Sequence, residues 1–329
     1  MPKQYKHLTL AERDVITTLL AENKSLRAIA QALGRSPSSI SRELKRNASP
    51  EYRLYLSHRA HGRSQQRRKQ ASQRLRLKHP GLRRYVRAKL SVGWSPEQIA
   101  GRLRWEHPGW SISPEAIYQY IYHPRTADRT ELIRCLRRAH RRRRPKGPAR
   151  RERKTKIPQR ISIEQRPAAV ADRRQFGHWE GDSLISRRSL AALNTLVERK
   201  SSLLCLTYLP RKTAQATQQA VVRRLGGLPP QARRTLTLDN GTENAAHQQI
   251  TAQLGTRCYF THPYAAWERG IGENTNGLIR WYLPKGTDFR SISAAELARI
   301  ESLLNNRPRK RLGFKTPLEV ATPFVALRH

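Results

Sequence analysis

Two short stretches decide how this chain of 329 residues folds: LDNGTE at residues 238–243 and GIGENTNG at residues 270–277. The first places Asp239 where an alternating segment, expected to be a strand, stops at an Asn-Gly turn. The second places Glu273 in a segment that is expected to be helical, with 33 residues between the two acids. Each stretch therefore predicts a carboxylate held at a defined place by regular structure.

A third acid precedes these two in the chain. Asp182 ends the segment GHWEGD at residues 177–182, inside a stretch that is expected to be a strand. The chain around the acids is strongly basic, with 65 Lys and Arg against 24 Asp and Glu and a formal net charge of +41. Three separated carboxylates in such a chain predict a metal site that acts on a polyanion.

The pattern of the carboxy-terminal half predicts a mixed sheet flanked by helices, because consecutive strands are followed by alternating helix and strand. Asp182 then lies in the middle of a strand and Asp239 at the end of another. The expected strands are 178–186, 190–198, 201–209, 234–239 and 257–261, and the expected helices are 213–225, 245–254 and 268–283.

Phosphoryl transfer explains why several carboxylates are needed at one site. Hard oxygen ligands hold Mg2+ while leaving room for water and substrate oxygens in its shell. Two ions about 3.5–4 Å apart can activate the attacking oxygen and stabilise the leaving oxygen. We expect two Mg2+ ions, with Mn2+ able to substitute, gripped by Asp182 and Asp239, with Asp182 between them and Glu273 completing the second.

The expected helix at Glu273 carries further suitable residues on the same face. Asn276, Gly277 and Arg280 follow at three, four and seven residues. They would add a small residue that permits close approach and a cation that binds phosphate. This face therefore predicts a ligand and a phosphate contact together.

Other interpretations of the same acids remain open. The sequence Asp-Asn-Gly commonly forms a β-hairpin turn, and on its own it favours that turn over a catalytic strand end, so Asp239 alone predicts little. Glu268 and Asp288 compete with Glu273 for the third position. Glu268 is five residues from Glu273, about 140° around a helix, so both cannot face one pair of ions.

The distribution of charge indicates a nucleic-acid partner. Residues 1–170 hold 41 Lys and Arg against 12 Asp and Glu, so the excess is concentrated in the amino-terminal half. A basic packaging protein is the alternative, but six Trp and ordered apolar stretches argue against a purely disordered chain. The three Cys show no paired spacing, and no apolar run is long enough to span a membrane. We therefore expect a soluble cytoplasmic protein, with no membrane and no small-molecule substrate.

The first 50 residues predict a helix-turn-helix. A capping box at 9–12, a helix from Ser25 to Gly34, and a third helix capped by Ser36 and ending near Arg46 make three short helices with a tight turn. The third helix offers side chains suited to bases and phosphates in a major groove, namely Ser38, Ser39, Arg42, Lys45 and Arg46. A plain three-helix bundle is the alternative.

A second helix-turn-helix is predicted by capped helix starts at 95–96 and 113–114, with a purely structural helical spacer as its alternative. Basic runs at 63–78 and 137–156 lie between and after these units. Like charges repel, so such runs stay extended unless a polyanion neutralises them. We interpret them as straps along the phosphate backbone, with Arg141, Arg142, Arg143 and Arg144 as the densest contact.

Five groups of residues carry a resemblance to a known family: 5–44; HWEGD at 178–182; DNGTE at 239–243; ENTNGLIR at 273–280 with PKGTD at 284–288; and NNRPRKRLG at 305–313 with TP at 316–317. They resemble the Asp-Asp-Glu (DDE) transposases of bacterial insertion sequences, specifically the IS-thirty family, over nearly the whole chain. The last two groups are the most specific. One residue departs from the pattern: Ser183 follows Asp182 where an aliphatic residue is expected.

The resemblance implies a ribonuclease-H-like catalytic domain with Asp182, Asp239 and Glu273 as its metal-binding and catalytic triad. It also implies a metal-dependent transposase that binds the terminal inverted repeats of its element and carries out DNA strand cleavage and strand transfer. Double-stranded DNA, as repeats and as target, is the expected partner. Because two DNA ends must be brought together, we expect a homo-oligomer on DNA.

The expected architecture is therefore multidomain, with an all-α amino-terminal region and an α/β catalytic domain. We expect these domains: a helix-turn-helix at 1–50, a basic helical linker at 51–85, a second helix-turn-helix-like domain at 86–135, a basic linker at 136–164 and the catalytic domain at 165–329. The alternative function is a sequence-specific DNA-binding regulator derived from a transposase. A retroviral-type integrase is less well supported, because the chain lacks the paired Cys of a His-Cys zinc domain.

Overall fold

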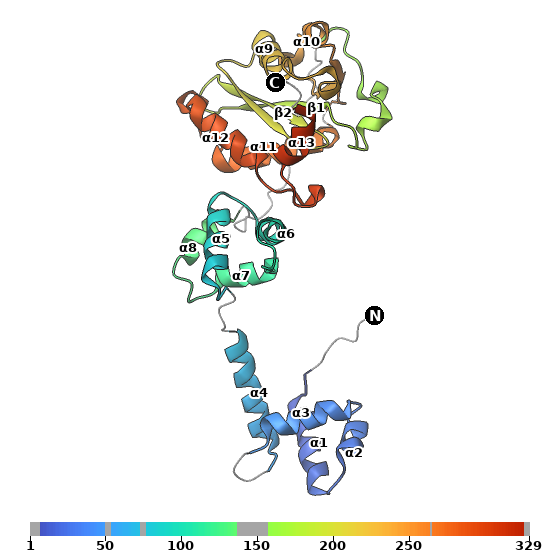
Figure 1. Ribbon diagram of the computed structural model, residues 1–329, viewed down its shortest axis with the longest axis vertical. Coiled ribbons are helices and arrows are strands. Elements are labelled where there is room, and N and C mark those ends of the chain that lie inside the picture. Colours follow the sequence, from blue (N-terminus) through green and yellow to red (C-terminus); the bar gives the residue numbers. More distant parts are fainter. Residues whose placement is uncertain (1–6, 50–53, 73–76, 137–156, 264, 326–329) are drawn as a thin grey trace. The chain divides into compact units, whose positions relative to one another are not determined.

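The computed structural model describes residues 7–49, 54–72, 77–136, 157–263 and 265–325. The chain divides into two compact units, residues 1–76 and residues 77–329. In Figure 1 the first unit is blue and the second runs from teal to red. The basic run 137–156, including Arg141 to Arg144, lies outside the described residues. Within the described ranges, no helix combines the length and the apolar character that crossing a membrane requires.

The first unit contains four helices, α1 (Leu10–Ala21), α2 (Leu26–Ala32), α3 (Pro37–Asn47) and α4 (Ser57–Ser72). The predicted caps are confirmed: Thr9 and Glu12 form a capping box, and the hydroxyls of Ser25 and Ser36 each accept from an amide of the first turn. Gly34 follows α2 with a φ of 58°, the left-handed conformation that glycine adopts without strain. The predicted helix-turn-helix is therefore present.

The outer surface of α3 carries the side chains predicted to read DNA. Ser38, Arg42, Lys45 and Arg46 are exposed, whereas Ser39 is half-buried with its hydroxyl 2.9 Å from that of Ser36. The Arg42 guanidinium donates to the Ser38 carbonyl, one turn earlier. This surface can therefore present three cations to a polyanion.

A buried ion pair joins α1 to α3. Arg13 is 2% exposed, and its Nε donates to Glu43 at 2.7 Å. The same guanidinium donates to the Leu8 carbonyl at 2.6 Å, and the Tyr55 hydroxyl donates to Glu43 at 3.0 Å. Because both charges are desolvated, the pair is stable only while each partner is satisfied, and it fixes α3 against the rest of the unit.

Residues 63–72 of the first basic run do not form the extended strap that their charge predicted, but lie in a helix, as expected for a basic helical linker. Residues 57–72 form α4, and two of its arginines bind the end of α3. Arg63 donates to the carbonyls of Asn47 and Ala48 at 3.1 and 3.0 Å, and Arg67 donates to the Asn47 side chain. These carbonyls lie at the negative end of the α3 dipole, so cations stabilise them and part of this charge is used within the fold.

The second unit begins with four helices, α5 (Pro80–Ser91), α6 (Pro96–Glu106), α7 (Pro114–Tyr122) and α8 (Arg129–Cys135). They pack around a core that includes Leu77, Val86 and Ile117. The domain boundary expected at residue 86 falls inside α5, because this core recruits residues from 77 onward. The turn from α6 to α7 spans residues 107–113, longer than the usual three or four, and α7 contains no Lys or Arg.

The carboxy-terminal half is built on one five-stranded sheet in the order β3-β2-β1-β4-β5. The first three strands are antiparallel, and β4 is parallel to both β1 and β5. The pairing of β1 with β2 continues without interruption through Ser183, so this residue causes no bulge. The strands are β1 (His178–Ile185), β2 (Ala192–Glu198), β3 (Leu204–Leu209), β4 (Thr235–Leu238) and β5 (Arg257–Phe260).

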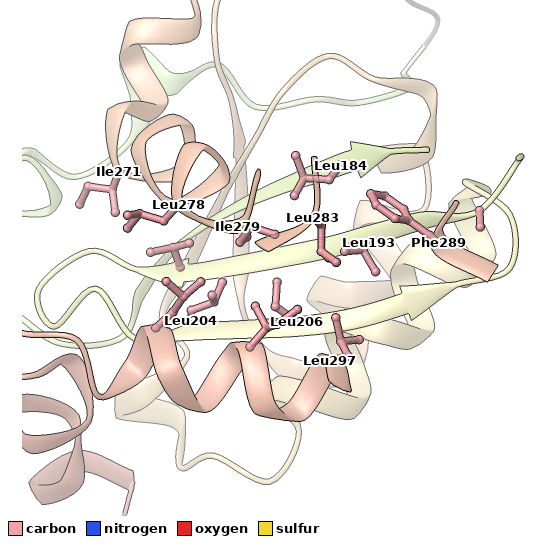
Figure 2. Close-up of a cluster of buried hydrophobic side chains, with 14 residues drawn as sticks. Leu184, Leu193, Leu204, Leu206, Ile271, Leu278, Ile279, Leu283, Phe289 and Leu297 are labelled. Carbon is pink, nitrogen blue, oxygen red and sulfur yellow. The ribbon is translucent and has the colours of Figure 1, made fainter. Parts of the chain in front are cut away.

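Helices cover both faces of this sheet, as predicted (Figure 1). One face packs against α9 (Ala214–Leu225) and α10 (His247–Leu254), and the other against α11 (Gly270–Tyr282) and α12 (Ala294–Asn305). Strand residues alternate between the two cores: Trp179 belongs to the first and Leu184 to the second. Figure 2 shows the second core, in which Leu278 and Ile279 of α11 face Leu184 and Leu193 of the sheet.

The remaining elements are α13 (Pro317–Val325) and short 3-10 helices at Ile163–Gln165, Ala168–Val170, Pro230–Ala232, Thr242–Asn244, Ala266–Arg269, Phe289–Ser291 and Lys310–Leu312.

The closing segment of the chain, residues 305–319, binds the edge strand β3 and helix α6. Asn305 is buried and pairs with both the amide and the carbonyl of Leu204 in the edge strand β3, at 2.8 Å each. Arg102 of α6 forms an ion pair with Glu319 of α13 at 2.6 Å, and Gln98 donates to the Pro308 carbonyl at 2.8 Å. The closing segment therefore caps a sheet edge and joins α6 to the domain that contains the sheet.

We expect the substitution Arg13→Gln to destabilise the first unit by about 3 kcal/mol, because it leaves the Glu43 carboxylate without its buried partner. Amide hydrogen exchange of α1 to α3 in the full chain should accelerate accordingly. All six Trp lie in the second unit, so the urea unfolding curve from Trp fluorescence should be unchanged. Unaltered exchange in α3 would show that the pair does not support this helix.

Candidate active site

The register of two parallel strands brings the first two acids together. In the pairing of β1 with β4, Glu180 lies opposite Thr237. Two residues further along each strand come Asp182 and Asp239. Residues two apart on a strand point to the same face, so the acids project from neighbouring strands at the same place in the sheet. This register is the physical basis of the site.

One guanidinium connects the two acids. Arg269, immediately before α11, places Nη1 3.2 Å from Asp182 Oδ1 and Nη2 3.2 Å from Asp239 Oδ2. Its side chain is 12% exposed, and those of Asp182 and Asp239 are 24% and 33% exposed. Burial lowers the pKa of Arg269, but Asp182 and Asp239 outweigh that effect and raise it overall. The two carboxylates therefore already share one cation.

Further hydrogen bonds orient each carboxylate. Asp182 accepts from the Ser183 amide and from Asn276 Nδ2, both at 2.8 Å. Asp239 accepts from Asn244 Nδ2 at 2.8 Å and from the Gly241 amide at 3.1 Å. The chain then turns into a short 3-10 helix, so the Asp-Asn-Gly sequence is not the tip of a hairpin.

Helix α11 lies along β1 and contacts it at three successive turns. The Gly272 amide donates to Glu180, Asn276 donates to Asp182, and Arg280 donates to the Ile185 carbonyl, at 2.9, 2.8 and 2.8 Å. Four helical residues rise about 6 Å and two strand residues about 6.6 Å, so the contacts of Gly272 and Asn276 repeat in step, and the longer Arg280 side chain reaches one residue further along β1. This match fixes the position of α11 along the strand that carries Asp182.

Glu180 is a positioning residue that sequence reasoning missed. It is 1% exposed and forms a buried ion pair with Arg199, and its second oxygen accepts from Gly272. Its position two residues before Asp182, on the same face of β1, was the signal that could have identified it. Glu180 therefore ties the start of α11 to the sheet.

Glu273 follows Gly272 in the first turn of α11 and is exposed. It lies one residue beyond the Glu180 contact and three before Asn276, which reaches Asp182. In the part of the chain that the structure describes, no three Asp, Glu, His or Cys side chains are close enough together to hold one metal ion. The structure thus brings Asp182 and Asp239 together and places Glu273 on the adjacent helix, outside their immediate contact.

The competing acids are engaged elsewhere. Glu268 binds both the amide and the ring of His262, at 2.9 and 2.7 Å. Asp288 pairs with Arg290 at 2.8 Å and accepts from Ser189 at 2.7 Å. Arg280, predicted to bind phosphate, is half-buried over the Phe289 ring. Of the acids on or beside α11, Glu273 is therefore the one left exposed to solvent close to the Asp182 contact.

The chemistry of the donor set suits a hard divalent cation. Asp182 and Asp239 supply carboxylate oxygens, the ligands that Mg2+ and Mn2+ prefer. Their arrangement around the single positive charge of Arg269 shows that both can face one cation. The pair fits the ligand chemistry of a metal site, whereas Glu273 lies on the adjacent helix, outside their immediate contact.

His178, at the start of β1, is a buried neutral residue. Its Nε2 donates to Gln175 Oε1 at 3.1 Å, and its Nδ1 accepts from the Thr235 hydroxyl at 2.8 Å. Burial, with Arg234, Arg199 and Arg166 nearby, lowers its pKa to about 4. It therefore joins β1 to β4 just before the acids and carries no charge near pH 7.

Known proteins match this chain closely. A helix-turn-helix domain family matches residues 4–47. The transposase for insertion sequence element IS1086 of Cupriavidus metallidurans is 40% identical over 328 residues, covering 98% of this chain and 96% of that protein. Transposase InsI for insertion sequence element IS30A of Escherichia coli is 42% identical over 327 residues, covering 98% of this chain and 85% of that protein.

A further relative and a solved structure complete the comparison. The transposase for insertion sequence element IS4351 of Bacteroides fragilis is 38% identical over 317 residues, covering 95% of each chain. The catalytic core domain of BIV integrase aligns with 44% of this chain and 92% of its own length, at 20% identity and a TM-score of 0.35.

We expect Glu180→Gln to destabilise the second unit by about 3 kcal/mol, because Arg199 would lose its buried counter-charge. Urea unfolding followed by Trp fluorescence measures this change. Glu296→Gln, which breaks an exposed pair with Arg299, is the matched control and should have little effect. Equal midpoints for the two variants would show that the Glu180 pair does not support the fold.

Acidification should destabilise the second unit through His178. The unfolded chain takes up a proton near pH 6.5, whereas the folded residue stays neutral down to about pH 4. The contribution of neutral His178 to the free energy of unfolding is complete above pH 6.5 and is lost as the pH falls toward 4. We expect wild type to lose about 2 kcal/mol more than His178→Gln over this window, by urea unfolding. His58→Gln, at an exposed position of the first unit, should behave like wild type.

Proposed function

Because this chain belongs to the IS30 (IS-thirty) family of insertion-sequence transposases, we propose that it binds the terminal inverted repeats of its own element and cuts and joins DNA at Asp182, Asp239 and Glu273. It is a DDE transposase, a polynucleotidyl transferase with a ribonuclease-H-like domain that uses divalent metal ions. The observation that carries the assignment of residues is the pair of carboxylates on neighbouring parallel strands, held by one guanidinium.

In this proposal Asp182 and Asp239 hold the metal and Glu273 completes its ligands from α11. When bound, divalent ions activate the attacking oxygen and stabilise the leaving oxygen. The chain contributes orientation: Asn276 and the Ser183 amide set Asp182, and Asn244 sets Asp239. Water would attack in the first step, and the freed 3′ hydroxyl of DNA in the second.

The contacts to DNA are proposed to begin at α3. Its exposed Arg42, Lys45 and Arg46 match the needs of a helix in a major groove. Arg141 to Arg144 would add affinity without sequence information. The helices α5 to α8 are a weaker candidate for base reading, because α7 offers no cation.

Further features of the proposal follow from the reaction. Mg2+ is proposed as the physiological ion, with Mn2+ able to replace it, because both accept carboxylate oxygens. Joining requires two element ends at once, so we propose a homo-oligomer on DNA. The protein would act on the bacterial nucleoid, in the cytoplasm.

We expect Asp239→Asn and Glu273→Gln to lose cleavage and joining of DNA that carries the element's ends, because each removes a proposed metal ligand. Binding to the same DNA, measured by electrophoretic mobility, should be retained. Glu268→Gln and Asp288→Asn are matched controls that should keep cleavage, since their carboxylates are engaged elsewhere. Metal-dependent joining that persisted in Asp239→Asn would contradict the site. Binding without cleavage in wild type would favour a DNA-binding regulator.

A further inference from the structure

The Arg269 guanidinium directly contacts the two proposed catalytic carboxylates, Asp182 and Asp239. Its two terminal nitrogens each lie 3.2 Å from one acid, and Nη1 also donates to the Gly181 carbonyl at 3.2 Å. The Arg269 Nε is buried and has no hydrogen-bond partner among the described residues. The guanidinium is therefore held by the two acids and one carbonyl, with one donor unsatisfied.

Arg269 contacts the acids of the sheet but does not itself belong to a strand. It ends the short 3-10 helix Ala266–Arg269 and immediately precedes α11, which begins without a side-chain cap. The acids, by contrast, are placed by β1 and by the end of β4. The guanidinium thus comes from the segment that leads into α11, whereas the strand register fixes the positions of the two carboxylates.

Electrostatics explains why a cation is needed here. Two carboxylates on neighbouring strands repel each other, and the guanidinium cancels that repulsion. A divalent ion would require the same oxygens at about 2.0–2.1 Å. An ion and a guanidinium sharing these oxygens would place like charges side by side in a partly buried site, which is unfavourable.

We propose that Arg269 is an internal counter-ion that competes with the divalent metal. Its guanidinium stabilises the pair Asp182 and Asp239 before the ion binds, and it leaves both carboxylates when the ion arrives. The released group then lies beside the metal, where the nearest polyanion is the DNA backbone, and a guanidinium binds phosphate with two parallel hydrogen bonds. This inference rests on the metal site of the proposed function.

The competition predicts that removing Arg269 tightens metal binding. Mn2+ alone is titrated into the full-length protein without DNA, and free Mn2+ is measured by electron paramagnetic resonance. We expect Arg269→Gln to bind Mn2+ about tenfold more tightly than wild type, because the ion no longer displaces a bound cation. Arg299→Gln removes one charge far from the acids, where Arg299 pairs with Glu296, and should match wild type. Equal or weaker binding in Arg269→Gln would overturn the proposal.

Two further measurements separate the possible failures. Asp182→Asn should weaken Mn2+ binding; if it does not, the carboxylate site of the proposed function is wrong, whatever Arg269 does. If Arg269→Gln does not fold, as judged by Trp fluorescence, Arg269→Lys takes its place. A single ammonium cannot span both acids as the fork does, so this variant should also bind Mn2+ more tightly than wild type. Unchanged affinity in Arg269→Lys would then refute the competition.

Mn2+ binding measured in the presence of DNA tests whether the released Arg269 guanidinium binds phosphate. In wild type, cleavage-resistant phosphorothioate DNA carrying the element's ends should increase the apparent affinity for Mn2+, because phosphate captures Arg269. In Arg269→Gln this gain should shrink, since the captured group is absent. An equal gain in both proteins would show that Arg269 does not pass from carboxylate to phosphate.

Discussion

The contact between α11 and β1 is the constraint on which the catalytic half depends. A helix that advances about 6 Å every four residues runs beside a strand that advances about 6.6 Å every two. Gly272 and Asn276 therefore meet Glu180 and Asp182 in turn. Because Glu180 is buried with Arg199, the first of these contacts cannot shift without exposing a charge to apolar surroundings. The helix that carries Glu273 is thereby aligned with the strand that carries Asp182.

The basic excess of this chain serves two purposes. Arg13, Arg199 and Arg269 are largely withdrawn from solvent, and each neutralises acids that would otherwise destabilise the fold. The arginines of α4 that bind the end of α3 belong to the same group. A formal charge of +41 consequently overstates the charge available to DNA. The exposed cations of α3 are the clearest part of what remains.

Much of the fold could be predicted from local pattern, because caps and alternation are local properties. The capping box at Thr9, the end of β4 before Asp239 and the helix beyond residue 270 all follow from neighbours in sequence. Strand register is a nonlocal property, so the closeness of Asp182 and Asp239 was predicted from the chemistry that several carboxylates perform at one metal site and from the family resemblance, and not from local pattern. Glu180 was missed because its partners, Arg199 and Gly272, are distant in the chain. The extended strap over 63–78 was wrong for residues 63–72, because charge repulsion was considered without the α3 carbonyls that offset it, whereas a basic helical linker at 51–85 agrees with α4.

The hydrogen bonds between α4 and the end of α3 couple the movements of the two helices. Since Arg63 and Arg67 grip the last carbonyls and side chain of α3, the two helices turn as one rigid piece. The 16 residues of α4 form an arm about 24 Å long. A rotation of α3 would therefore move the far end of α4 as well, so the direction of this arm depends on the orientation of α3.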